Sequence, residues 1–191
     1  MKQRKKVLVV VAHPDDETIW MGGTLLKNNW NLTIISLCRR DDEDRAPKFK
    51  KVCKILKAES YMSDLEDEKL NNIPLKEVIK RIQKITNGKI YDYIFTHGKN
   101  GEYGHKRHKD VNRAIRKMLK QNLLSCKKVF FFSYIKKGNF CDNNKKADRF
   151  IYLDDINFLK KKDLILKKYG FKEENFENKC CKNIESFKMN K

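Results

Sequence analysis

The chain has 191 residues, 40% of them hydrophobic, which is enough to bury the core of one domain without disulfides or a structural metal. No stretch approaches the roughly 20 apolar residues of a membrane span, and the N-terminus lacks the cleavage site of a signal peptide, so we expect a soluble, cytoplasmic protein. The net charge of +19 favours anionic partners such as phosphates, anionic lipids or acidic glycans.

The hydrophobic pattern alternates between strand and helix periods along the chain. It predicts, in order, a strand at 5–13, a helix at 15–29, a strand at 31–38 and, after a polar loop, a helix at 48–58. There follow a short strand at 59–63, a helix at 74–86 and a strand at 91–98. The rest is a loop running into a helix at 101–121, strands at 127–135 and 149–154, and a helix at 156–170.

Strands that alternate with helices are typical of a Rossmann-like α/β fold, with a mainly parallel sheet and helices on both faces. The chain has no repeat and no linker, so we assign 1–191 to a single domain, and we expect its basic tail, about 172–191, to be partly disordered. The six cysteines form no C-x-x-C pair, which favours buried, reduced thiols. The adjacent Cys180 and Cys181 are either redox-active or an incidental pair.

The first predicted strand ends directly in the string AHPDDE, residues 12–17. In doubly wound sheets, ligands bind just beyond the carboxyl ends of the strands. Three adjacent acids at that edge repel one another unless a cation lies among them, although the N-terminus of the next helix relieves some of the repulsion. The turn has no G-x-G-x-x-G, which argues against a nucleotide site. The string therefore indicates a divalent metal.

All four histidines follow either the first or the fourth predicted strand, at His13, His97, His105 and His108. These two strands are commonly adjacent in sheets of this kind. Two nitrogens and one oxygen around an open position are typical of hydrolytic zinc sites, and His13, Asp16 and His108 provide that set. Iron(II) is also compatible with these ligands. Asp15 is then free to act as the base that takes a proton from water.

Each of these residues also has a purely structural interpretation. Asp15 or Asp16 could cap the following helix. Glu17 suits the first turn of a helix, or orients a metal ligand. His97 could merely hydrogen-bond the backbone, and Trp20 is expected in the core, with a place in a sugar site as the alternative.

The string AHPDDE, together with GEYGHKRH at 101–108, closely resembles the signature of the PIG-L/LmbE family of zinc-dependent N-deacetylases. That family removes the acetyl group from N-acetylglucosamine units in glycolipid precursors, thiol precursors, chito-oligosaccharides and antibiotic intermediates. The resemblance covers about 6–134. It implies that His13, Asp16 and His108 bind the metal and that Asp15 is the general base.

The resemblance implies roles for three more residues. His105 matches a histidine that, when protonated, stabilises the tetrahedral oxyanion or protonates the leaving amine. Tyr103 matches a tyrosine that supports the oxyanion in some members. Arg45 resembles a substrate-binding arginine of an R-x-x-E motif, although Lys48 stands where the family usually has Glu.

These features predict a metal-dependent hydrolase that removes acetyl from an N-acetyl amino sugar, free or in a lipid- or nucleotide-linked conjugate. The basic surface mildly favours an anionic substrate. The alternative is a basic protein that binds nucleic acid or glycan on an inactive deacetylase-like fold. Lysines lie on all predicted helices and are not interleaved with aromatic residues on one surface, so we expect no specific nucleic-acid partner. The oligomeric state is not readable from the sequence.

Overall fold

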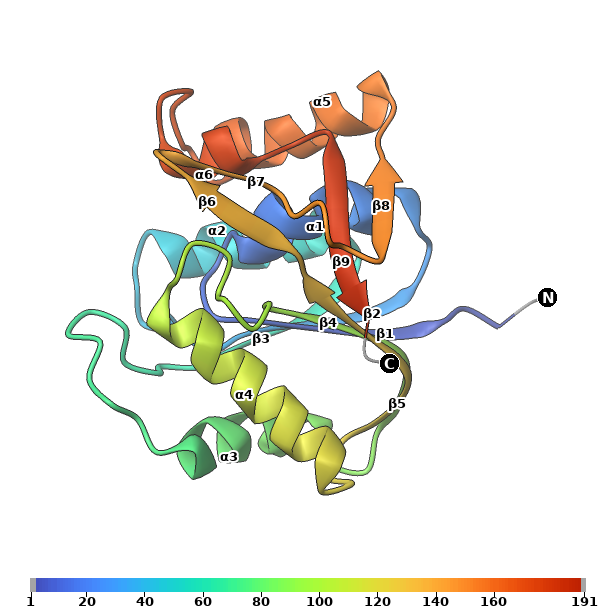
Figure 1. The fold of residues 1–191 in the computed structure, drawn as a ribbon, viewed down its shortest axis with the longest axis vertical. Helices are drawn as coiled ribbons and strands as arrows, with labels where there is room; N and C mark the ends of the chain where they lie inside the picture. The colour runs from blue at the N-terminus through green and yellow to red at the C-terminus, as the bar shows by residue number, and fades with distance from the viewer. Residues whose placement is uncertain (1–2, 190–191) are drawn as a thin grey trace.

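The centre of the fold is the strand β1 (Lys6–Val11), whose last five residues have no exposed surface. In the computed structural model, which describes residues 3–189, β1 lies in a seven-stranded sheet covered by helices on both sides (Figure 1). A run of Val and Leu suits this position, because a central parallel strand is buried on both of its faces.

The first half of the chain builds four parallel strands, each followed by a helix. The elements are β1, α1 (Asp16–Lys27), β2 (Asn31–Ser36), α2 (Arg45–Ile55), β3 (Ala58–Met62), α3 (Leu75–Thr86), β4 (Ile90–Thr96) and α4 (Lys106–Lys120). The second half adds β5 (Ser125–Phe132), β6 (Tyr134–Lys137), β7 (Phe140–Asn143), β8 (Arg149–Tyr152), α5 (Asp155–Asp163), the π-helical η1 (Leu164–Lys168), α6 (Phe176–Cys180) and β9 (Ile184–Met189).

The strand order is β3-β2-β1-β4-β5-β9-β8, with β9 antiparallel to both of its neighbours, and β6 and β7 form a separate hairpin. Successive residues of β1 face opposite sides, as expected for a strand. Val7, Val9 and Val11 pack in the core beneath α1 and α2, whereas Leu8 and Val10 pack against α3 and α4. The molecule therefore has three layers, with the sheet between two helical layers (Figure 1).

The order in which strands are added to the sheet changes direction after β3. From β1 it builds outward to β3, and it then returns to place β4 on the other side of β1. The turns after β1 and β4 consequently lie side by side at the carboxyl edge of the sheet, which is where such folds bind ligands. The predicted adjacency of these two strands is confirmed.

The predicted Rossmann-like α/β fold, with a mainly parallel sheet and helices on both faces, is also confirmed. Two local expectations are wrong. The strand predicted at 127–135 is broken at Ser133, where the chain leaves β5 and starts the hairpin strand β6. The tail, expected to be partly disordered, forms α6 and β9, and β9 fills a place between β5 and β8 in the main sheet.

Helix α1 contains a kink that this last strand stabilises. The backbone at Met21 leaves helical geometry, at φ −150° and ψ 17°. The N–H groups of Gly23 and Thr24 therefore lack partners within the helix and donate to the Glu185 carboxylate on β9, both at 2.8 Å. The Lys161 ammonium neutralises Glu185 at 2.8 Å, and both side chains are fully buried.

Two further observations concern membranes and thiols. Within residues 3–189, no helix has both the length and the apolar composition needed to cross a bilayer. All six cysteines are free, and Cys180 and Cys181 are buried. The Cys141 N–H donates to the sulfur of Cys180 at 3.1 Å, so this thiol packs as part of the core beneath α6.

Candidate active site

The turn between β1 and α1 presents two carboxylates with different surroundings. The Asp16 side chain is fixed by Trp20, whose indole N–H donates to Oδ1 at 2.9 Å, so that Oδ2 faces the histidines. Burial alone would raise the pKa of Asp16, but His108 and His97 hold it well below its usual range. Trp20 thus lies in the core, which is one of its two predicted locations. It also lines a hollow together with Asp15 and Asp16.

Three predicted ligand atoms form a nearly equilateral triangle. His13 Nδ1 lies 3.2 Å from Asp16 Oδ2 and 3.2 Å from His108 Nε2, and His108 Nε2 lies 3.3 Å from Asp16 Oδ2. A tetrahedral zinc with bonds of about 2.0 to 2.1 Å separates its ligand atoms by about 3.3 Å. The donor types and their spacing therefore fit a zinc or iron(II) ion. Other groups with atoms within 4.8 Å of one another are His13/His105/His108, Asp16/His97/His108 and His13/Cys38/Asp67.

A buried carboxylate that was not identified from the sequence orients two of the histidines. Glu102 Oε2 lies 2.6 Å from His108 Nδ1 and 2.8 Å from His97 Nδ1, and Oε1 accepts from the Gly98 N–H at 2.7 Å. The Ala12 N–H donates to His97 Nε2 at 2.9 Å, which occupies the lone pair that a metal would need. The backbone interpretation of His97 is thus the one that its hydrogen bonds favour.

A second carboxylate, also not identified from the sequence, lies behind His13. Asp67 Oδ2 is 3.2 Å from His13 Nε2 and accepts from Arg39 Nε at 3.0 Å. Carboxylates in this position commonly fix the tautomer of a metal-binding histidine. Asp67 follows β3 in an irregular loop of mixed charge, so neither hydrophobic periodicity nor a motif distinguishes it. Glu102 had one signal, its place within GEYGHKRH.

Asp15 lies beside the triangle in a strained conformation. Its φ is 107°, a value that is unfavourable for a residue with a side chain, and such strain often accompanies functional sites. The side chain does not cap α1, and instead Oδ2 accepts from the Arg45 guanidinium at 2.5 Å. Burial, together with the Asp16 carboxylate, raises the pKa of Asp15 well above its ordinary value, although Arg45 opposes this shift.

Glu17 holds the backbone of this turn. It is fully buried, its Oε2 accepts from the Asp15 N–H at 3.1 Å, and its Oε1 accepts from Thr18 Oγ1 and Tyr169 OH at 2.6 and 2.7 Å. Burial raises the pKa of Glu17 to about 7. Glu17 lies in the first turn of α1, as the first of its two predicted roles requires, and its contact in the site is with Asp15 and not with a metal-ligand candidate.

His105 and Tyr103 come from the loop after β4 and lie next to the metal-ligand candidates. The His105 ring is 4.6 Å from that of His13, in an edge-to-face arrangement, and its Nδ1 is buried without a hydrogen-bond partner. Burial, with His108 and His13 nearby, lowers the pKa of His105 to about 3. This environment favours the neutral imidazole, and the protonated form that the resemblance implies stays a prediction. The Tyr103 ring is 5.6 Å from that of His105.

These residues enclose a hollow of about 200 Å³. This is smaller than the roughly 300 to 1,000 Å³ of pockets that bury a drug-sized ligand, so the hollow admits only a small group. Its walls combine the AHPDDE turn with Arg39, Arg45, Asp67, Tyr103, His105, Phe176 and Glu177. Arg45 and Asp67 place a guanidinium and a carboxylate at the walls, where they are suited to hydroxyl and amide groups.

Comparison with known proteins places this geometry in context. Residues 8–119 match the family model PIG-L, described as GlcNAc-PI de-N-acetylase. The chain is 28% identical over 124 residues to the uncharacterized protein L374 of Acanthamoeba polyphaga mimivirus, a match that covers 56% of this chain and 55% of that protein. The chain therefore spans only about half the length of this curated relative.

Two solved structures share the fold at low sequence identity. The A40926 pseudoaglycone deacetylase Dbv21 superposes with a TM-score of 0.64 at 12% identity, covering 87% of this chain and 82% of that one. The deacetylase triple mutant Orf2*T of the teicoplanin biosynthetic pathway gives 0.63 at 12% identity, with 86% and 81% covered.

Proposed function

The chain belongs to the PIG-L family, and we propose that it is a metal-dependent deacetylase that hydrolyses the acetamide of an N-acetyl amino sugar. The observation that carries this proposal is the triangle of His13, Asp16 and His108 atoms with a second carboxylate, Asp15, beside it in one hollow. The family description names a de-N-acetylase of a GlcNAc unit, which agrees with this chemistry.

His13, Asp16 and His108 would hold the ion, which we propose to be Zn²⁺, with Fe²⁺ as the alternative that the same donors accept. When bound, such an ion polarises the acetamide carbonyl and lowers the pKa of water to about 7. Glu102 holds the outer nitrogen of His108, so that this ring keeps one orientation, and the Asp67 carboxylate lies 3.2 Å from the outer nitrogen of His13.

Asp15 acts as the general base. It takes a proton from the attacking water and then passes that proton to the amine nitrogen as the carbon–nitrogen bond breaks. Its strained backbone turns the carboxylate away from the helix end that an ordinary N-terminal Asp would cap. Arg45 holds Oδ2 and so leaves Oδ1 as the oxygen for proton transfer.

His105 and Tyr103 stabilise the oxyanion that forms on the acetamide oxygen. A neutral imidazole still donates one N–H, and the phenol donates its O–H. Removing one donor of this kind typically costs about 3 kcal/mol of transition-state stabilisation. His105 then needs no proton of its own to release, because Asp15 carries the proton that the amine receives.

The substrate that we propose is an N-acetyl amino sugar, either free or as part of a lipid- or nucleotide-linked conjugate. The hollow admits only a small group of such a unit, and the remainder of a conjugate would lie outside it. Arg45 at the wall is the residue that we propose to contact the sugar, while the Phe171 ring, 4.6 Å from its guanidinium carbon, limits how far it moves.

The test measures acetate released from a panel of N-acetylglucosamine compounds, together with the zinc and iron content of the purified protein. Asp15→Asn is expected to keep its metal and to lose about 10²- to 10⁴-fold in rate, because only the base is removed. His13→Ala is expected to lose both the bound metal and the release of acetate. The matched control is Asp44→Asn, a mainly exposed carboxylate at the start of α2, which should behave as wild type.

Wild-type turnover by Asp15→Asn would contradict the assignment of the base. A wild-type protein that binds metal and sugar but releases no acetate from any compound would instead support the alternative, an inactive deacetylase-like fold that binds glycans.

A further inference from the structure

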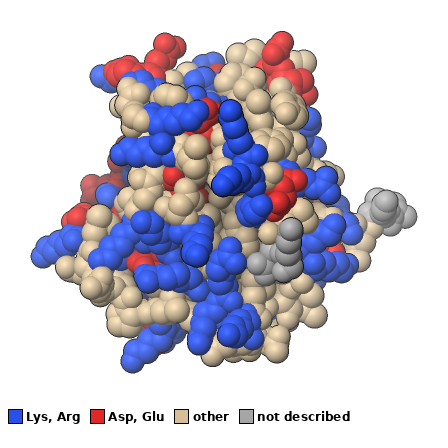
Figure 2. All heavy atoms as spheres, viewed as in Figure 1, with Lys and Arg blue, Asp and Glu red and all other residues tan. Residues whose placement is uncertain are grey.

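The helical layer formed by α3 and α4 has a strongly basic outer surface, on which Glu77 is a partly exposed acid. Every exposed residue on these two fully described helices is Lys or Arg, namely Lys76, Lys80, Lys84, Lys109, Arg113, Arg116, Lys117 and Lys120. Figure 2 shows blue side chains over much of the face on which α4 lies. By contrast, the exposed residues of α5 in the other layer are Asp155, Ile156, Leu159, Lys160 and Asp163, so the pattern is not uniform around the molecule.

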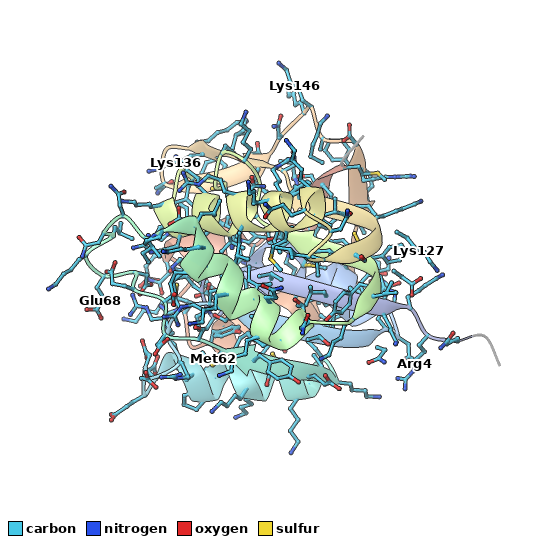
Figure 3. All side chains as sticks on the ribbon, turned by 90° about the horizontal axis from the view of Figure 1, so that it is seen from below. Arg4, Met62, Glu68, Lys127, Lys136 and Lys146 are labelled. Atoms are coloured by element: carbon cyan, nitrogen blue, oxygen red, sulfur yellow. The ribbon has the colours of Figure 1, made fainter. Side chains whose placement is uncertain are left out.

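A hollow of about 740 Å³ lies beside this surface. Five of its twelve described lining residues are basic and none is acidic; the basic ones are Lys99, Lys109, Arg116, Lys146 and Lys188. Asn100, Asn144 and Ser133 add polar groups. Figure 3 shows Lys146 projecting on the side of the molecule where α4 lies, with α2 on the opposite side.

Arg116 provides the hollow with a planar guanidinium group as well as a positive charge. Its guanidinium carbon lies 4.0 Å from the centre of the Phe131 ring, and its side chain is exposed to solvent. The Phe131 ring packs against one face of the guanidinium, which holds this planar group in place beside the exposed lysines of α4. Bases of single-stranded nucleic acids stack on arginine planes of this kind.

We propose that this face, α4 with the adjoining hollow, binds single-stranded nucleic acid without sequence specificity. The exposed row from Lys109 to Lys120 extends about 16 Å at 1.5 Å per residue, which is long enough for more than one nucleotide of a strand. The lysines contact backbone phosphates, and the Arg116 plane receives a base. Positively charged grooves with stacking planes are the usual means of such binding.

An anionic membrane fits the same face less well. Binding to a bilayer surface requires apolar side chains that protrude into it. In this hollow Phe131 and Phe132 are each only 1% exposed, and Ile135, at 36%, is the sole exposed apolar residue among those described at its lining.

The site is separate from the proposed catalytic pocket. The two hollows share no lining residue, and the loop from Gly98 to Gly104 lies between them. Nucleic-acid binding does not rest on the proposed deacetylase activity, so either property can fail without the other.

The test measures the fluorescence anisotropy of a labelled 20-nucleotide oligo(dT) at several salt concentrations. The first variant combines Lys109→Glu, Lys117→Glu and Lys146→Glu. Its matched control combines Lys50→Glu, Lys51→Glu and Lys54→Glu on the exposed side of α2, which changes the net charge equally. A third variant, Arg116→Lys, keeps the charge and removes the plane.

We expect the α4 variant to bind more than tenfold more weakly and to lower the slope of log K against log salt by about 2, since each lost phosphate contact contributes about 0.7. The α2 control should lose much less, Arg116→Lys should weaken binding several-fold, and acetate release should be unchanged in all three. Equal losses of affinity in the α4 and α2 variants would show that net charge alone accounts for binding, and would overturn the proposal. Vesicles of anionic phospholipid, or a sulfated glycan, that displace the oligonucleotide at equal charge concentration would also overturn it.

Discussion

Glu102 shows how one residue can determine the chemistry of two others. Because the Ala12 N–H donates to His97 Nε2, the proton of His97 must lie on Nδ1, which donates to Glu102. The same carboxylate oxygen requires a proton on His108 Nδ1, so that Nε2 keeps its lone pair for the site. The two rings stack with centroids 3.8 Å apart, which adds a steric constraint to the electrostatic one.

The change Glu102→Gln should weaken metal binding while the fold survives. The amide nitrogen cannot accept a hydrogen bond, so at least one of the three donors around residue 102 loses its acceptor. Loss of such an outer contact typically costs 10- to 100-fold in metal affinity. Competition with a zinc chelator would measure this affinity, and circular dichroism would measure the fold.

Glu77→Gln on α3 is the control for this prediction, because Glu77 is a partly exposed acid that pairs only with Arg81 among its described contacts. Equal metal affinity in the wild-type and Glu102→Gln proteins would show that the carboxylate does not act through the histidine.

At this scale the sequence identified residues that belong to contiguous strings after a strand. His13, Asp15, Asp16 and His108 became candidates because a strand end and a histidine pair mark their positions, and their roles stay predictions. Asp67 and Glu102 act through partners about 54 and 6 residues away along the chain, counted from His13 and His108 respectively. The partner of Asp67 depends on a loop conformation that no local pattern encodes, whereas Glu102 had one signal, its place within GEYGHKRH.

Helix α1 illustrates how one element depends on a distant one. Its second half begins at the kink near Met21, and its free N–H groups are satisfied by Glu185 and not by a residue of its own segment. Gly23 leaves room for the Leu153 side chain, which would have to shift if a Cβ were added, because that Cβ would lie 2.2 Å from Leu153 Cδ1.

Lys161→Met should destabilise the protein by about 3 to 5 kcal/mol, the usual cost of leaving one partner of a buried ion pair uncompensated. Both Lys161 and Glu185 are fully buried, and Lys161 also donates to the Lys182 carbonyl at 3.0 Å. The midpoint and slope of urea unfolding would measure the change.

Lys160→Met removes the neighbouring, exposed lysine and should change the free energy of unfolding by less than about 0.5 kcal/mol. The double change Lys161→Met with Glu185→Gln should recover part of the loss. Equal effects at residues 160 and 161 would show that the buried pair has no special role.

The strand β9 marks the limit of sequence prediction at the scale of elements. Its residues IESFKM do not alternate strictly between apolar and polar, they lie in a Lys/Asn-rich segment, and they are only six in number. What makes them a strand is pairing with β5 and β8, which are distant in sequence. Four of the five parallel strands, β1, β2, β4 and β5, carry their own apolar run, whereas β3 (AESYM) does not.

The whole molecule carries a net charge of +19, which repels itself in the folded state more than in the expanded unfolded chain. Salt screens this repulsion over about 10 Å at 0.1 M. We therefore expect stability to increase when salt is raised from about 0.02 to 0.2 M, by on the order of 1 kcal/mol or roughly 2 to 4 °C in Tm. Thermal unfolding followed by circular dichroism would measure this.

The α2 triple variant, which lowers the net charge by six units, serves as the control, because it should show a smaller gain with salt. A Tm that falls as salt rises would mean that the surface ion pairs outweigh the general repulsion.

The contact between α1 and β9 also determines when the protein can fold during synthesis. Gly23 and the Glu185 that satisfies its N–H are 162 residues apart. At 5 to 20 residues per second, a ribosome needs roughly 8 to 32 s to make the chain between them. For that interval the second half of the first helix lacks its cap. The sheet can begin to form from its five parallel strands. The contact between α1 and Glu185 can form only after residue 185 has been made.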